Sequence, residues 1–279
     1  MKLFKTPKGN IIYTNNQAYK LPETDWDTLL NNDNLIQDLQ DFINDTSRVS
    51  LSEKELNTIA LAPIKNQEVW AAGVTYYRSK TARMEESKES GGSSFYDKVY
   101  EAERPELFFK STAQRVCGPG QNVRIRKDSL WSVPEPELTL VVTANQKIIG
   151  YTVGNDMSAR DIEGENPLYL PQAKSYTGST ALGPCIYITN EPLSLHTQIS
   201  LSIFRKNKKA FEGHTTVAEI KRSFSELIEF LFSEMDFPKG CFLMTGTGIV
   251  PADDFTLKVN DRIEISIEGI GTLINEVGI

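Results

Sequence analysis

Apolar positions along most of this chain come in short runs separated by turn residues, a spacing that is typical of β-strands. Helical spacing, with apolar residues every three or four positions, occurs at 25–43 and 223–232. Two further strand signals lie within residues 2–19. We therefore predict a mainly β structure with few helices. The remaining strands are predicted at 69–74, 107–110, 138–143, 148–153, 186–188, 199–203 and 262–270.

The same pattern divides the chain near residue 65. Residues 1–65 contain almost no candidate chemistry, and we expect them to form a small N-terminal domain that supports a dimer or a lid. Residues 66–279 are expected to form the catalytic domain. From 79 to 103 the sequence is charged and polar around the glycine pair at 91–92, which suits either a lid over a site or a solvated loop.

One predicted hairpin brings three carboxylates together. Glu135 and Glu137 are two positions apart, so on a strand both side chains project from one face. A two-residue turn at 145–146 would pair positions that sum to 291, and 135 plus 156 is 291. Asp156 would then lie opposite Glu135, with Cβ atoms about 5 Å apart. Three carboxylates on one patch repel each other unless a positive charge lies between them.

The sequence allows two interpretations of these carboxylates, a metal site or a solvent-exposed strand. Oxygen ligands alone suit a hard cation such as Mg²⁺, Mn²⁺ or Ca²⁺ and not zinc or copper. Alternatively, Glu135 and Glu137 face solvent on an edge strand, since Pro134 and Pro136 cannot donate to a neighbouring strand.

Other polar residues lie at the ends of the predicted strands. Lys110 follows one buried strand, and Lys174 follows two close prolines that we expect to prevent a regular helix across 166–174. Either lysine could hold an anionic substrate or simply lie at the surface. The turn at 245–248 offers hydroxyls and backbone N–H groups that could hold a carboxylate, or it is only a tight turn that needs glycine.

Composition narrows the class of protein. The chain has 279 residues with 30 basic and 37 acidic side chains, so its formal charge of -7 leaves no basic surface for nucleic acid or anionic lipid. No apolar run is long enough to span a bilayer, and the first residues do not read as a signal peptide. The three cysteines form neither a zinc spacing nor a disulfide framework. We expect a cytoplasmic protein with a small-molecule partner.

Three segments together resemble the fumarylacetoacetate hydrolase family. They are Pro-Glu-Pro-Glu-Leu at 134–138, Gly-Tyr-Thr-Val-Gly-Asn-Asp-Met-Ser-Ala-Arg-Asp at 150–161 and Gly-Thr-Gly at 246–248. The segment 162–174 is most similar to the 2-keto-3-deoxy-D-arabinonate dehydratase branch. The resemblance implies an α+β fold with a mixed β-roll catalytic domain, a small N-terminal α/β domain, Mg²⁺ and a homodimer or homotetramer.

The resemblance also implies roles for individual residues. It carries metal ligation onto Glu135, Glu137 and Asp156, and 2-oxo-acid binding onto Lys174 and onto Thr247 with its neighbour Gly246. Lys174 is expected to position the substrate and to serve as a proton carrier. Second-rank candidates for contacts to substrate hydroxyls and for proton transfer are Arg78, Ser79, Glu106 and Lys110.

One departure from the family pattern bears on the reaction. Ser79 stands where the C–C hydrolases of the family have a histidine that activates water, so dehydration is favoured over hydrolysis. We therefore expect a Mg²⁺-dependent dehydratase that converts a 2-keto-3-deoxy sugar acid, such as 2-keto-3-deoxy-D-arabinonate, to 2,5-dioxopentanoate through a metal-stabilised enolate. The alternatives are an acylpyruvate-type hydrolase, a 2-oxo-enoate hydratase or isomerase, and a non-catalytic protein that holds a structural cation.

Overall fold

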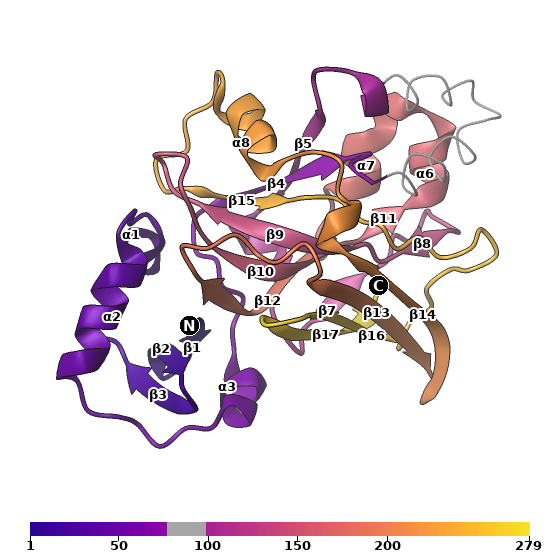
Figure 1. The fold of residues 1–279 in the computed structure, drawn as a ribbon. Coiled ribbons are helices and arrows are strands. Elements are labelled where there is room, and N and C mark those ends of the chain that lie inside the picture. Colours follow the sequence, from indigo (N-terminus) through magenta and orange to yellow (C-terminus); the bar gives the residue numbers. More distant parts are fainter. Residues whose placement is uncertain (77–98) are drawn as a thin grey trace.

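Two β-sheets that pack face to face form most of the molecule (Figure 1). The computed structural model describes residues 1–76 and 99–279. The larger sheet has the strand order β3-β2-β1-β12-β10-β9-β15-β4-β5, with β6 beside β12, and it mixes parallel and antiparallel pairs. The smaller sheet has the order β14-β13-β16-β17-β7. The expected α+β fold with a mixed β-roll is confirmed. None of the described helices is long and apolar enough to cross a membrane.

The first 65 residues extend the larger sheet, because β1 pairs with β12 in antiparallel register. The helical pattern at 25–43 forms two helices and not one. Its break contains four short polar residues at 31–34, whose side chains compete for backbone hydrogen bonds; Asn32 accepts one from the backbone of Asn34 at 2.9 Å. The division into two domains remains a prediction. The elements of this part are β1 Lys2–Thr6, β2 Gly9–Thr14, β3 Gln17–Lys20, α1 Trp26–Leu30, α2 Leu35–Asp45 and α3 Glu53–Ile59.

The remaining elements include every strand that the apolar runs predicted. They are β4 Glu68–Gly73, β5 Glu106–Thr112, β6 Val116–Cys117, β7 Asn122–Arg124, β8 Ser132–Val133, β9 Pro136–Val142, β10 Ile148–Asp156, β11 Ser158–Ala159, α6 Arg160–Glu165, α7 Leu170–Lys174, β12 Thr180–Ile188, β13 Gln198–Arg205, β14 Lys208–Thr216, α8 Phe224–Phe232, β15 Cys241–Met244, β16 Arg262–Ile267 and β17 Gly271–Gly278.

Hydrophobic residues fill both faces of the larger sheet. On one face, Leu138, Leu140 and Val153 pack with Leu201 and Ile265 of the smaller sheet. The opposite face is covered by α1 and α2, and its buried residues include Trp26, Leu30, Leu35, Val69 and Phe242. Strands β9 and β10 lie in the middle of this arrangement, so side chains at their ends are shielded from water.

The β9–β10 hairpin has the predicted register but not the predicted turn. Partners such as Leu140 and Tyr151, or Leu138 and Val153, sum to 291. However, Ile148 pairs with Val142, which gives 290, and a bulge before Gly150 adds the missing residue. The turn is therefore a longer loop closed by Thr143 and Lys147, followed by a bulge.

The segment 166–174 is more regular than we expected. Residues Pro167–Tyr169 form a 3₁₀ turn, and α7 follows directly, with a proline in the first turn of each. The first N–H groups of a helix have no hydrogen-bond partner within that helix, so a proline in the first turn removes no helical hydrogen bond. The prediction of an irregular connection was wrong for this reason.

Candidate metal centre and active site

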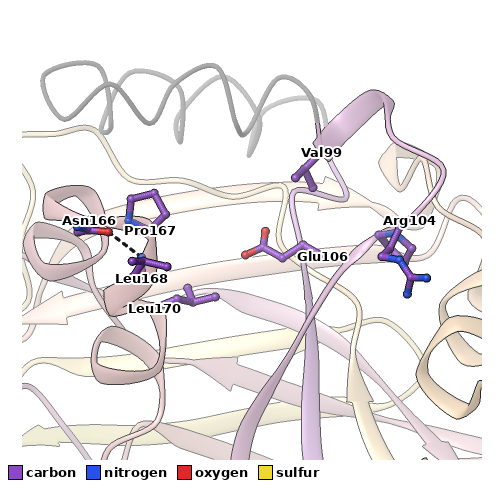
Figure 2. A pocket seen from close by; sticks show the side chains of 8 residues that line it. Val99, Arg104, Glu106, Asn166, Pro167, Leu168 and Leu170 are labelled. Atoms are coloured by element: carbon purple, nitrogen blue, oxygen red, sulfur yellow. Dashed lines mark hydrogen bonds between the residues drawn. The ribbon is translucent and has the colours of Figure 1, made fainter. Parts of the chain in front are cut away.

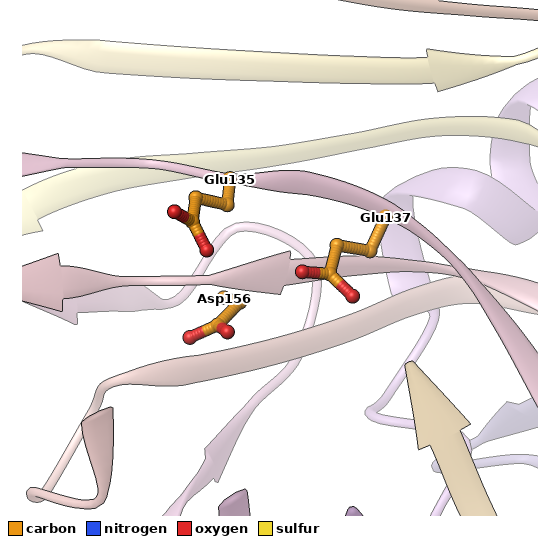
Figure 3. Close-up of side chains that lie close together, drawn as sticks. All are labelled: Glu135, Glu137 and Asp156. Atoms are coloured by element: carbon orange, nitrogen blue, oxygen red, sulfur yellow. The ribbon is translucent and has the colours of Figure 1, made fainter. Parts of the chain in front are cut away.

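Glu135, Glu137 and Asp156 lie together at the end of the central hairpin (Figure 3). Glu135 and Asp156 exchange two backbone hydrogen bonds of 3.2 and 2.9 Å. One oxygen from each of the three carboxylates lies within 4.8 Å of the others. The side chains are 3%, 2% and 1% exposed, because β9 is an inner strand between β10 and β15. The alternative of an exposed edge strand is therefore wrong.

Two of the three carboxylates are paired with basic side chains. The Lys174 ammonium lies 2.5 Å from Glu135 and 3.1 Å from Asp156. Arg160 contacts Glu135 at 2.5 Å, and Lys110 contacts Asp156 at 2.9 Å. Each of these ion pairs is almost fully buried. Because buried charges need partners, these contacts hold Glu135 and Asp156 in fixed positions.

Glu137 is the exception. It accepts a hydrogen bond from the backbone N–H of Gly246 at 2.7 Å, but among the described residues no lysine or arginine forms an ion pair with it. Burial raises the pKa of Glu137 well above its usual range, and the nearby charges of Asp156 and Glu135 raise it further. A cation between the three groups would relieve this repulsion, and three carboxylate oxygens are ligands that suit magnesium.

The loop after β15 forms another wall of the site. Thr75 donates a hydrogen bond to the carbonyl of Thr245 at 2.7 Å, which ties this loop to the end of β4. Gly246 has a φ of +89°, a left-handed conformation that favours glycine. Thr247 follows and is 4% exposed. The residues that line the pocket around the carboxylates are Ala72, Gly73, Val74, Phe108, Glu135, Glu137, Asp156, Lys174, Gly246 and Thr247.

Glu106, at the start of β5, reaches the edge of this pocket. A Cβ atom built on Gly73 would lie 2.1 Å from a carboxylate oxygen of Glu106, so the absence of a side chain at Gly73 makes room for the acid. Glu106 itself lines a second cavity, of about 630 Å³ (Figure 2). The described residues of that cavity are Val99, Arg104, Pro105, Glu106, Asn166, Pro167, Leu168 and Leu170.

The other candidates are placed differently or lie outside the described part. Lys110 is completely buried and is absent from the described residues that line the carboxylate pocket. Burial lowers the pKa of its ammonium, although Asp156 beside it acts in the opposite direction. Arg78 and Ser79 lie outside the described residues, as does the predicted lid up to residue 98. The fragment 99–101 after it is helical.

The sequence reasoning missed two residues that belong to the charge network. Ser158 accepts a hydrogen bond of 2.5 Å from the ammonium of Lys174, and Arg160 pairs with both Glu135 and Glu163. Asp156 and Ser158 are at alternate positions of one extended segment, whereas Arg160 begins α6. That alternation was the signal that Ser158 shares the face of Asp156, and no comparable signal exists for Arg160.

Comparisons with known proteins give a consistent picture. Residues 69–278 match the family model described as fumarylacetoacetate (FAA) hydrolase C-terminal. The chain is 40% identical over 288 aligned positions to the 2-dehydro-3-deoxy-D-arabinonate dehydratase of Saccharolobus solfataricus, covering 99% of this chain and 96% of that protein. It is 45% identical over 219 positions to the probable 2-keto-3-deoxyxylonate dehydratase of Haloferax volcanii, covering 78% and 74% of the two chains.

A solved structure is similar along nearly the whole chain. It is 2-keto-3-deoxy-D-arabinonate dehydratase complexed with magnesium and 2,5-dioxopentanoate, with a TM-score of 0.83 and 36% identity. The similarity covers 99% of this chain and 98% of that one.

Proposed function

This chain belongs to the fumarylacetoacetate hydrolase family, and from its site we propose that it is a magnesium-dependent dehydratase of a 2-keto-3-deoxy sugar acid. The observation that carries the proposal is the buried cluster of Glu135, Glu137 and Asp156. It occurs in a chain that is similar over 99% of its length to an enzyme named as such a dehydratase. We take 2-keto-3-deoxy-D-arabinonate as the first substrate to test and 2,5-dioxopentanoate as its product.

The proposed reaction removes one molecule of water. A proton leaves C3 of the sugar acid and hydroxide leaves C4, which forms a C3–C4 double bond. A proton then leaves C5 and another is added at C3, so that the double bond moves to C4–C5. The resulting enol becomes the C5 aldehyde. When bound by the three carboxylates, magnesium would hold the 2-oxo acid and stabilise the negative charge that develops on its keto oxygen.

We assign the proton transfer at C3 to Glu106. Its carboxylate lies against Gly73, and Gly73 lines the carboxylate pocket. Lys174 is less suited to accept a proton, because an ammonium that contacts two carboxylates and Ser158 has no free electron pair. We assign Lys174 and Thr247 to positioning the substrate carboxylate, with Gly246 holding Glu137 in place.

The remaining expectations belong to the same proposal. Arg78 and Ser79 are assigned to the hydroxyl groups of the substrate, and Mn²⁺ or Ca²⁺ is the alternative occupant of the metal site. We also propose a homodimer or homotetramer, which light scattering of the purified protein would measure. A cytoplasmic location would be tested by fractionation of cells that produce the protein.

The deciding experiment measures turnover across a panel of 2-keto-3-deoxy acids with magnesium chloride, by following the carbonyl groups of the product. An acylpyruvate is included so that release of pyruvate would reveal a hydrolase instead. Glu137→Gln keeps the shape of the ligand but removes its charge, and we expect kcat/KM to fall by more than about 100-fold. The same variant should lose the rise in melting temperature that magnesium produces in the unmodified chain.

Glu276→Gln is the matched control, because Glu276 is exposed on β17 of the other sheet. It should keep both the activity and the thermal response to magnesium. The metal assignment is wrong if Glu137→Gln retains metal-dependent turnover. The substrate assignment is wrong if none of the sugar acids loses water while the acylpyruvate is cleaved.

A further inference from the structure

Lys110 is a completely buried lysine at the centre of a group of oxygen acceptors. Its ammonium donates to the carbonyl of Ser179 at 2.8 Å, to the hydroxyl of Ser179 at 3.1 Å and to the carbonyl of Met157 at 3.4 Å. It also donates to the backbone carbonyl of Lys174 and contacts a carboxylate oxygen of Asp156 at 2.9 Å. Five acceptors therefore surround three N–H groups, and all five belong to the protein.

These acceptors come from three segments that are all distant from Lys110 in the sequence. Asp156 and Met157 are at the end of β10, Lys174 is the last residue of α7, and Ser179 precedes β12. The hydroxyl of Ser179 also donates to the carbonyl of Lys174 at 2.7 Å, so the two contacts reinforce each other. Lys110 thus fixes the backbone from which the Lys174 side chain extends, and it fixes one carboxylate that this side chain contacts.

We propose that Lys110 is a positioning residue that sets the geometry of Lys174 and Asp156 and makes no contact with the substrate. This proposal rests on the proposed function for its turnover measurement, and on the metal site of Glu135, Glu137 and Asp156 for its magnesium titration. The complete burial of Lys110 and its absence from the described pocket lining are the observations that separate it from a substrate-binding lysine. Groups that orient metal ligands in this way commonly change metal affinity and activity by about 10–100-fold when they are removed.

The sign of the effect on metal binding distinguishes this role from a purely electrostatic one. A positive charge 2.9 Å from Asp156 opposes a cation at the same carboxylate, so removing the charge alone would tighten magnesium binding. Loss of position has the opposite sign, because Asp156 would no longer be held in place for the metal. A lysine that only contacts the substrate would leave magnesium affinity unchanged and would raise KM.

The test uses Lys110→Met, which has nearly the same length but no donor. Magnesium chloride alone is titrated into the metal-free chain by calorimetry, and kcat and KM are measured separately at saturating magnesium. We expect the Kd for magnesium to rise by about 10–100-fold and kcat to fall by about 10–100-fold, with KM within about twofold of its original value. Tighter magnesium binding, unchanged binding with a raised KM, or no change at all would each overturn the proposal.

A milder pair of variants decides the question if Lys110→Met has no cooperative melting transition. Ser179→Ala removes one acceptor of Lys110 and one donor to Lys174. Ser175→Ala is its matched control, because the Ser175 hydroxyl donates to Phe109 at 2.8 Å and so joins the same two elements without touching Lys110. Only Ser179→Ala should weaken magnesium binding and lower kcat, and equal effects of the two variants would refute the role.

The two proposals can fail independently. If the unmodified chain does not dehydrate any sugar acid, the proposed function fails, whereas the calorimetric comparison still tests Lys110. If dehydration occurs but Lys110→Met binds magnesium as the unmodified chain does, the positioning role alone fails.

Discussion

The loop that carries Gly246 allows a prediction of stability to be worked out from individual contacts. In Gly246→Ala the new Cβ atom would lie 2.0 Å from the hydroxyl oxygen of Thr75 and 3.1 Å from the carbonyl of Ala72. Thr75 would have to turn away and give up its 2.7 Å hydrogen bond to Thr245. The substitution therefore combines a strained backbone, a lost hydrogen bond and an overfilled core.

Each of these effects has a known range. A left-handed φ such as the +89° of Gly246 costs about 1–2 kcal/mol for alanine. Loss of the hydrogen bond costs about 0.5–1.5 kcal/mol, and overpacking costs about 1–3 kcal/mol. We expect the free energy of unfolding to fall by roughly 3 to 6 kcal/mol, which lowers the melting temperature by about 5–10 °C in a chain of this size.

Two further variants separate the three effects. Gly120→Ala is the matched control, since Gly120 has a φ of +73° with no heavy atom within 4 Å of the built Cβ, so only the backbone strain of about 1–2 kcal/mol applies. Thr75→Ala removes the atom that the new methyl group meets. In urea unfolding, the double variant Thr75→Ala/Gly246→Ala should therefore be more stable, by about 2 kcal/mol, than the sum of the single losses predicts.

Additive losses in that cycle, to within about 0.5 kcal/mol, would show that Thr75 and Gly246 do not meet as described. A loss in Gly246→Ala no larger than that in Gly120→Ala would contradict the reasoning as well. Because Gly246 also donates to Glu137 at 2.7 Å, the variant should bind magnesium more weakly wherever it remains folded.

Two other predictions concern the central hairpin. Asp33 accepts hydrogen bonds from Thr143 at 2.6 Å and Asn145 at 2.8 Å, and these lower its pKa in the folded chain. Its contribution to stability is therefore present above its unfolded pKa of about 3.9 and lost as pH falls through the lower folded value. Between pH 4 and 3 the unmodified chain should lose stability more steeply than Asp33→Asn in urea titrations, and parallel curves would contradict this. Leu140→Ala, at a completely buried core position, should cost about 2–5 kcal/mol in urea unfolding. A loss below about 1 kcal/mol would mean that the two sheets are not packed at Leu140.

The sequence was sufficient to predict the carboxylate cluster, because the cluster depends on the geometry of a single hairpin. The pleat repeats every two residues, so Glu135 and Glu137 must share a face, and only the register had to be inferred. That register was correct although the turn was not: the loop closed by Thr143 and Lys147 shifts the pairing by one, and the bulge before Gly150 shifts it back. The buried face constrains the register more strongly than the turn does.

Lys110 and Arg160 show what the sequence could not provide. Lys110 is a strand residue whose acceptors lie between positions 156 and 179, and nothing local indicates that α7 ends beside β5. Arg160 begins a helix, yet its guanidinium reaches back to Glu135. Both contacts depend on how separate elements pack, whereas periodicity describes only one element at a time. A buried basic residue and a surface one therefore look alike in the sequence.

The unequal pairing of the three carboxylates determines where a cation matters most. Glu135 and Asp156 each contact at least two basic side chains, so their negative charge is compensated before any metal binds. Glu137 has a single backbone N–H donor among the described residues, and burial raises its pKa. A buried charge without a charged partner costs several kcal/mol. Of the three carboxylates, Glu137 is the one whose charge a divalent cation would be the first to compensate. Substitution of Glu137 should therefore weaken magnesium binding without exposing an unpaired lysine or arginine. At Glu135 or Asp156, the same substitution would disturb the metal and the basic residues together.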